Sequence, residues 1–427
     1  MEFQFPRRLK NATFVMMALG LLAIIIGWIV EPTGHGHGGH TRWWANVLVC
    51  GFFFFAVALG AMFFYALQYA TETGWSSQVK RIFEAMSQYI PIGLGIILIV
   101  LICGAAHMHH LYHWMDTDIT YEYMVPGVDG AAAEYTNDGT VAGAVENPDY
   151  DHIIAGKKPY FGWFFWLRTI IYCVTFVVFM RLFRKWSLQE DQAPDLDLHY
   201  KQYRRSALFL VFFAFFSSTM AWDWLMSIDT HWFSTLYGWY IFSGMWVSTM
   251  IFATVLILWL KKRGNLPKVN DSHIHDLGKW VFAISMLWSY LWFSQFMLIW
   301  YSNIPEEVIY FITRLGPEFK WPFLITFAIN FAVPFYVLIA RDAKRNPNFL
   351  LPVAFLIFVM HFVDVYLLVV PGTVGPHWAD NGFMFYEWGM FLGFLGLFIQ
   401  VTMRSLEKAP LVPKNHPFLD ESEHHSI

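Results

Sequence analysis

The feature that most constrains this chain is a series of ten long apolar stretches. Each is close to the length of about 20 residues that an α-helix needs to cross the hydrocarbon core of a bilayer. A helix also satisfies all its backbone polar groups internally, as the bilayer interior requires. The sequence therefore predicts an all-α integral membrane protein with ten transmembrane helices. They cover approximately 11–30, 44–70, 88–113, 160–183, 205–228, 236–260, 278–301, 320–340, 349–370 and 383–403.

Composition supports this interpretation and limits the cofactors. Only 14% of the residues are charged, against about 25% in an average soluble protein. Cys50, Cys103 and Cys173 each stand alone inside an apolar stretch. They cannot form the four-thiolate set of an iron–sulfur cluster or a c-type haem attachment motif. The first apolar stretch lacks a small-residue cleavage site, so we expect it to remain as a helix.

The positive charges predict the orientation. Most Lys and Arg outside the apolar stretches fall in segments on one side of the predicted topology, such as 7–10, 181–205 and 261–268. Cytoplasmic loops carry this excess in membrane proteins. We therefore expect both termini to be cytoplasmic. The other side carries Arg42, Lys157, Lys158, Arg314 and Lys320.

Loops and a weak internal similarity suggest the organisation. The acidic outer loop 114–159 is long enough to be a docking surface for a partner. The stretch GHGHGGH at 34–40 is more typical of a flexible loop than of a metal site. The second to fifth helices resemble the sixth to ninth, which predicts two four-helix bundles with one peripheral helix at each end. The predicted divisions are 1–43, 44–235, 236–382 and 383–427.

Ionisable residues inside the apolar stretches mark the candidate site. His361 and Asp364 lie three residues apart near the centre of the ninth stretch, so they share a helix face. An Asp at the centre of a membrane helix costs about 2.5–3.5 kcal/mol on insertion scales. Asp223 lies toward the outer end of the fifth stretch, and Arg168 enters the fourth from the same side. Such residues usually have a function.

Histidines gather at the outer end of the third stretch. If the helix continued to 113, His107 and His110 would share a face with Cys103, whereas His109 and His113 would share another. We expect the second pair to lie in the membrane interface. Imidazole and carboxylate groups accept and pass protons. These groups suit a quinol, which gives up two protons with its two electrons.

Two motifs add a family resemblance. DWLMSIDTHWFSTLYG (223–238) and FSQFMLIWYSNIPEE (293–307) resemble the signatures of the quinol-handling membrane subunits of alternative complex III, in the polysulfide-reductase/NrfD-like family. Of the two paralogous subunits, C and F, the chain is more similar to F. The resemblance implies a bacterial inner-membrane complex that oxidises menaquinol, ubiquinol or another quinol. It also implies iron–sulfur and multihaem cytochrome c subunits, the paralogous membrane subunit, lipids and a terminal oxidase as partners.

From position and spacing we select two sets of site residues. The expected quinone-binding residues are His107, His110, Asp223 and Gln295, and the expected proton path comprises His361, Asp364, Asp229, Glu306 and Arg168. The chain itself is expected to hold no haem, iron–sulfur cluster or other metal, and no catalytic residue is assigned. Three alternatives stay open: a structural anchor with a degenerate quinol site that docks the outer subunits, a b-type cytochrome with two histidine ligands, and a secondary transporter.

Overall fold

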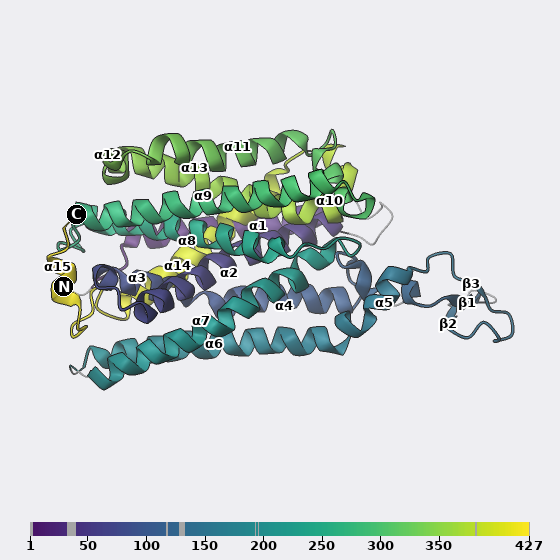
Figure 1. Ribbon diagram of the computed structural model, residues 1–427, viewed down its shortest axis with the longest axis horizontal. Helices are drawn as coiled ribbons and strands as arrows, with labels where there is room; N and C mark the ends of the chain where they lie inside the picture. The colour runs from purple at the N-terminus through teal and green to yellow at the C-terminus, as the bar shows by residue number, and fades with distance from the viewer. Residues whose placement is uncertain are drawn as a thin grey trace.

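The computed structural model describes residues 3–31, 40–116, 118–127, 133–192, 194, 196–380 and 382–426. Within these ranges ten helices are long and apolar enough to cross a membrane, and they run roughly along one axis (Figure 1). The prediction of an all-α chain with ten candidate membrane-spanning helices is therefore confirmed. Of the glycine- and histidine-rich stretch at 34–40, residues 34–39 lie outside the described residues.

Ten segments form the candidate crossings, and α3 and α4 together make one of them. The helices are α1 (Arg7–Val30), α2 (Thr41–Ala70), α3 (Lys80–Ser87), α4 (Ile90–Ala105), α6 (Trp163–Glu190), α7 (Leu196–Trp224), α8 (Leu236–Lys262), α9 (Asp271–Ser302), α11 (Lys320–Leu338), α13 (Pro347–Thr373) and α14 (Phe385–Glu407).

Shorter elements lie between and after these helices. They are the helices α5 (His152–Phe161), α10 (Pro305–Leu315), α12 (Arg341–Arg345) and α15 (Leu419–Glu423), the strands β1 (Tyr123–Val125), β2 (Glu134–Thr136) and β3 (Val145–Glu146), and the 3₁₀ turns η1 (Trp75–Gln78), η2 (His113–Met115), η3 (Asp118–Thr120), η4 (Met226–Ile228) and η5 (Gly375–Asp380).

The helices give the molecule two distinct ends. Figure 1 places both chain termini, α12 and α15 at one end, which we call the terminal end. The other end carries α5, α10 and the three strands, and we call it the loop end. The two termini thus lie at the same end, as an even number of crossings requires.

The helix α2 is central to the packing. It contacts α4, α7, α8, α13 and α14, and 94% of its most apolar window is buried. This burial explains why its sequence is apolar all round rather than along one stripe. The helices α2, α4, α6 and α7 contact one another in a closed cycle, which we call the first cycle. The helices α8, α9, α11 and α13 form a second cycle, and α2 contacts two of its members, α8 and α13.

The outer end of the third crossing differs from the expectation. The sequence predicts a helix to residue 113, but α4 ends at Ala105 because the chain turns there and His107 adopts a left-handed φ of 55°. The long loop that follows contains secondary structure. It carries α5 and a small antiparallel sheet in which β1 lies between β2 and β3.

The helix α10 is an addition that the search for apolar stretches missed. Asn303 ends α9 with a left-handed φ of 48°, and Pro305 occupies the first turn of α10. Proline suits this position because its missing N–H would have no intrahelical partner there. The helix lies at the loop end (Figure 1) and buries Tyr310, Phe311 and Arg314 while Glu306 is exposed.

Glycines allow α1 and α14, the first and last candidate crossings in the chain, to pack closely. A Cβ added to Gly20 would lie 2.3 Å from the Cα of Gly393, so neither position has room for a side chain. Small residues at such crossings let membrane helices approach and pack.

We expect Gly393→Leu to force α1 away from α14 and to lower stability by about 1–3 kcal/mol, as overpacking typically does. Thermal unfolding of the whole chain in detergent measures this. Gly95→Leu is the matched control, because a Cβ added at Gly95 meets nothing within 4 Å. An equal loss of stability in both variants would contradict the close crossing.

Candidate functional site

Asp364 lies at the centre of the second cycle of helices. It projects from α13 and is buried between α8 and α9. The Tyr240 hydroxyl donates to its Oδ1, and the indole Nε1 of Trp288 donates to Oδ2 at 3.2 Å. Among the residues that the structure describes, no cationic side chain forms an ion pair with it. Two neutral donors therefore solvate this carboxyl group without neutralising it.

His361 lies one turn before Asp364 on the same helix. Its ring is 1% exposed, and neither ring nitrogen has a hydrogen-bond partner within the described part of the chain. The Trp288 ring meets it edge-on, with centroids 5.1 Å apart. Buried polar atoms without a partner are rare, and each one requires an explanation such as a bound group or water. The imidazole is thus available to a ligand or to a water chain.

Asp364 separates two small cavities. One, of about 20 Å³, lies between α2, α8 and α13 and is lined by His361, Gly244 and Ser248. The other, of about 10 Å³, is lined by Gln295 and Tyr310. Asp364 itself lines both. Space for a single water needs about 10–15 Å³, so water-sized cavities flank this carboxyl group on two sides.

Gln295 and Asp229 lie between Asp364 and the loop end of the molecule. Gln295 is buried, and its Nε2 has no partner among the described residues. Asp229 follows η4 and accepts a hydrogen bond at 3.1 Å from Arg314 of α10. The Arg314 guanidinium also lies over the Tyr310 ring, 3.4 Å from its centroid, and donates to the carbonyls of α13. This arginine closes the loop end of the second cycle.

Asp223 is placed very differently in the first cycle. Arg168 binds its carboxylate with two hydrogen bonds, of 2.8 Å to Oδ2 and 2.7 Å to Oδ1. The Tyr172 hydroxyl donates to Oδ2 at 2.9 Å. The guanidinium lies over the rings of Tyr160 and Phe164. Asp223 and Arg168, which the sequence assigns to different sets, therefore lie together, and each neutralises the other.

His107 and His110 do not lie in a helix. Both belong to the turn after α4, where His110 Nδ1 lies 2.7 Å and His107 Nδ1 3.6 Å from Asp116. His107 is also at the edge of a cavity of about 240 Å³. We call this the loop-end cavity, and it is lined by Ala105, His107, Trp114, Met115, Thr120, Ile154, Lys158, Phe161, Gly162 and Trp166.

The structure corrects one expectation for the second pair of histidines, His109 and His113, which the sequence predicts to lie in the membrane interface. His109 is buried rather than interfacial. Its Nε2 lies 2.9 Å from the Val100 carbonyl, and its ring packs on Trp44. Burial lowers the pKa of His109 to about 4, so the ring is neutral and its role is in packing. The physical reason is the chain reversal at His107, which folds this residue back against α4.

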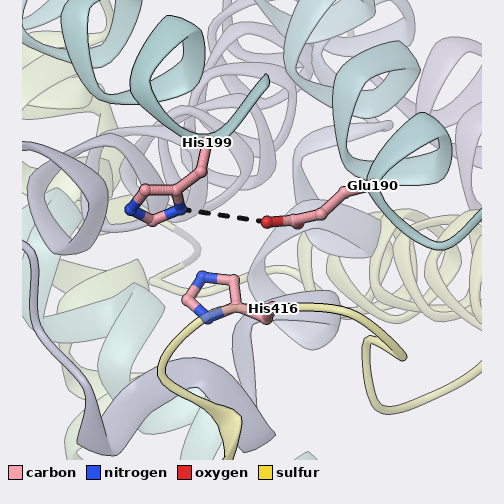
Figure 2. A group of neighbouring side chains, drawn as sticks. All are labelled: Glu190, His199 and His416. Carbon is pink, nitrogen blue, oxygen red and sulfur yellow. Dashed lines mark ion pairs between the residues drawn. The ribbon is translucent and has the colours of Figure 1, made fainter. Parts of the chain in front are cut away.

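A second polar group at the terminal end was not expected. Glu190 at the end of α6 binds Lys80 Nζ at 2.5 Å, and Lys80 also reaches the Tyr69 hydroxyl at 2.5 Å. His199 of α7 and His416 of the C-terminal segment lie beside this pair (Figure 2). Both histidines lie outside the ten predicted apolar stretches, and nothing local in the sequence indicates that they meet.

Comparison with known proteins does not assign a family. No family model matches the chain, and no curated protein matches it either. The class that fold and site define is a multi-pass α-helical membrane protein with an un-neutralised buried carboxyl group. Chemically, the arrangement can hold and pass protons through Asp364 and His361 and can accept a ring-shaped ligand in the loop-end cavity.

Proposed function

We propose that this chain is a membrane subunit of a respiratory quinol:electron-acceptor oxidoreductase of the alternative complex III type. In this proposal the two helix cycles are its two four-helix bundles, the terminal end is cytoplasmic and the membrane is the bacterial inner membrane. The partners are the paralogous membrane subunit, iron–sulfur and multihaem cytochrome c subunits and a terminal oxidase. The sequence motifs at 223–238 and 293–307 suggest the class.

The observation that carries the proposal is the environment of Asp364. A carboxyl group inside a membrane protein is costly and is usually retained for a function. The ion pair with Arg168 offsets the free-energy cost of burying the Asp223 carboxylate. Asp364, in contrast, accepts hydrogen bonds within the described residues only from a hydroxyl group and an indole N–H. Its position between two water-sized cavities favours a proton relay with His361, leading past Gln295 toward Asp229.

The loop-end cavity supports a separate site for the quinol ring. Its volume of about 240 Å³ is a little below the range of about 300–1,000 Å³ for ligand pockets. Trp114, Phe161 and Trp166 supply aromatic walls. His107 lines the cavity and lies near Asp116, so a histidine–carboxylate group is placed to take a proton from a quinol hydroxyl. Menaquinone or ubiquinone is the proposed ligand.

The experiment that tests this site uses the purified complex with a soluble quinol. We expect His107→Gln to lower kcat for quinol oxidation by about 100-fold, because a positioned acid–base group contributes about 100-fold or more to the rate. His424→Gln is the matched control, since this histidine is exposed at the terminal end. Unchanged quinol kinetics in a fully assembled His107→Gln complex would remove the loop-end cavity from the proposal.

The second candidate is a structural anchor with a degenerate quinol site. The Arg168–Asp223 pair favours it, because each charge is balanced by the other. An anchor would also use the loop end, with its sheet and α5, to dock outer subunits. Silent substitutions at both His107 and Asp364 in an assembled complex would support the anchor over the redox subunit.

A further inference from the structure

Three potential metal ligands meet at the terminal end of the molecule. Glu190 comes from the end of α6, His199 from the first turns of α7 and His416 from the segment after α14. One ligand atom from each lies within 4.8 Å of the others. Figure 2 shows the carboxylate and a ring nitrogen of each histidine facing one central space. We call these residues the Glu190–His199–His416 cluster.

Glu190 and His199 keep polar atoms that the described part of the protein does not use, whereas His416 Nδ1 accepts a hydrogen bond from Phe418 N at 3.3 Å. His199 is 3% exposed, yet neither of its ring nitrogens has a hydrogen-bond partner among the described residues. Lys80 takes Oε2 of Glu190, but Oε1 has no hydrogen-bond donor there and lies 3.9 Å from His199 Nδ1. Such buried atoms normally bind protein, water or an ion. A cavity of about 20 Å³ lies beside the cluster and is lined by His199, His416 and Lys80.

We propose that this cluster binds a divalent transition-metal ion, with Zn²⁺ as its typical occupant. Two imidazoles and one carboxylate are a common zinc ligand set that leaves a fourth position for water. Nitrogen donors favour Zn²⁺ over Ca²⁺ or Mg²⁺, which prefer oxygen. Zinc–ligand bonds are about 2.0–2.2 Å long, so the side chains need a small inward movement from their present separation.

Among the described residues, Lys80 is a cation that contacts Glu190 and so opposes the binding of a metal ion. The geometry of this contact nevertheless leaves space for the ion. The lysine binds the outer oxygen of Glu190 and the Tyr69 hydroxyl. The carboxylate can therefore lie between Lys80 and the metal, with one oxygen for each. Nearby Arg81 is paired with Asp191 at 2.5 Å, so its charge is balanced.

The metal would fasten the C-terminal segment to the α6–α7 connection. This segment, residues 408–426, already touches the connection through Asn415 Nδ2, which donates to the Glu190 carbonyl at 3.1 Å, and through Lys414 N, which donates to Asp191 at 3.0 Å. His416 is the only member of the cluster from this segment. Metal binding should thus slow proteolytic removal of residues 408–426. The site lies at the opposite end from the loop-end cavity and does not depend on quinol chemistry.

The test uses the full chain in detergent, purified with its native partners through a tag without histidine. After chelator treatment the protein is equilibrated with Zn²⁺, desalted and measured by elemental mass spectrometry. We expect about one zinc per chain, and about tenfold less in His199→Gln and His416→Gln. The control His424→Gln changes an exposed histidine of the same segment and should keep its zinc.

A second measurement needs no variant. Co²⁺ added to the stripped wild-type chain should give the visible absorption of a four-coordinate site and should protect residues 408–426 from protease. Zinc retention in either variant equal to the wild type would overturn the proposal. Failure of the wild-type chain to retain zinc, or to develop the Co²⁺ absorption, would overturn it as well.

Discussion

Replacing Asp364 by asparagine is expected to stop coupled proton release while the chain stays folded. The amide keeps the shape of the carboxyl group and can still accept the hydrogen bond from Tyr240. The bond from Trp288 is the one at risk, and one neutral hydrogen bond contributes only about 0.5–1.5 kcal/mol. An amide cannot take up and release a proton at this position. We expect proton release to fall by about 100-fold or more, on the scale of a lost acid–base group.

The measurement compares proton release with quinol oxidation in the same reconstituted vesicles. In the Asp364→Asn complex we expect the number of protons released per electron to fall by a larger factor than the rate of quinol oxidation. Asp342→Asn is the matched control, because this carboxylate is exposed in the first turn of α12. A normal ratio in a fully assembled Asp364→Asn complex would reject the relay. Asp364→Glu should restore part of the ratio, since it returns a titratable group.

Removal of Arg168 should have the largest effect on stability. Arg168→Ala leaves the Asp223 carboxylate, which is 0% exposed, without its two guanidinium hydrogen bonds. Breaking a buried ion pair by removing one partner typically costs about 3–5 kcal/mol. Within the described residues, the Tyr172 hydroxyl is then the remaining hydrogen-bond donor to the carboxylate. We expect a large fall in thermal stability and in the yield of folded protein.

The double variant Arg168→Met with Asp223→Asn separates charge from packing. Replacing both charges can be close to neutral, so most of the lost stability should return. Arg205→Ala, which changes an exposed arginine near the start of α7, is the control. Thermal unfolding in detergent ranks the four proteins. A loss for Arg168→Ala no greater than for Arg205→Ala would show that the pair adds little to stability.

These two experiments examine the same residue type in two environments. Asp223 accepts three hydrogen bonds, two from the Arg168 guanidinium and one from Tyr172, and is expected to act as a fixed structural charge. Asp364 has two neutral donors and a cavity on each side. The Arg168→Ala variant should therefore be judged by its stability and the Asp364→Asn variant by its proton coupling. An opposite pattern, with Asp364 structural and Asp223 coupled, would reverse the assignment of both sites.

The sequence predicted the crossings well because the signal is local. An apolar stretch of about 20 residues is sufficient to make a membrane helix whatever its neighbours are, and all ten were found. The same approach failed at the end of α4. The residues 106–113 have mixed polarity, and nothing in their periodicity shows that the chain reverses at His107. The amphipathic helix α10 was missed because it is short and polar on one face.

By itself the sequence determined that this is an all-α chain with ten candidate crossings and that few ionisable groups lie inside them. Tertiary structure decided what those groups do. Whether Asp223 or Asp364 receives an arginine depends on which helices pack side by side, and His416 meets Glu190 only because the C-terminal segment returns to α6. Hydrophobicity acts on each segment separately, whereas a hydrogen bond or ion pair needs two residues brought together by the fold.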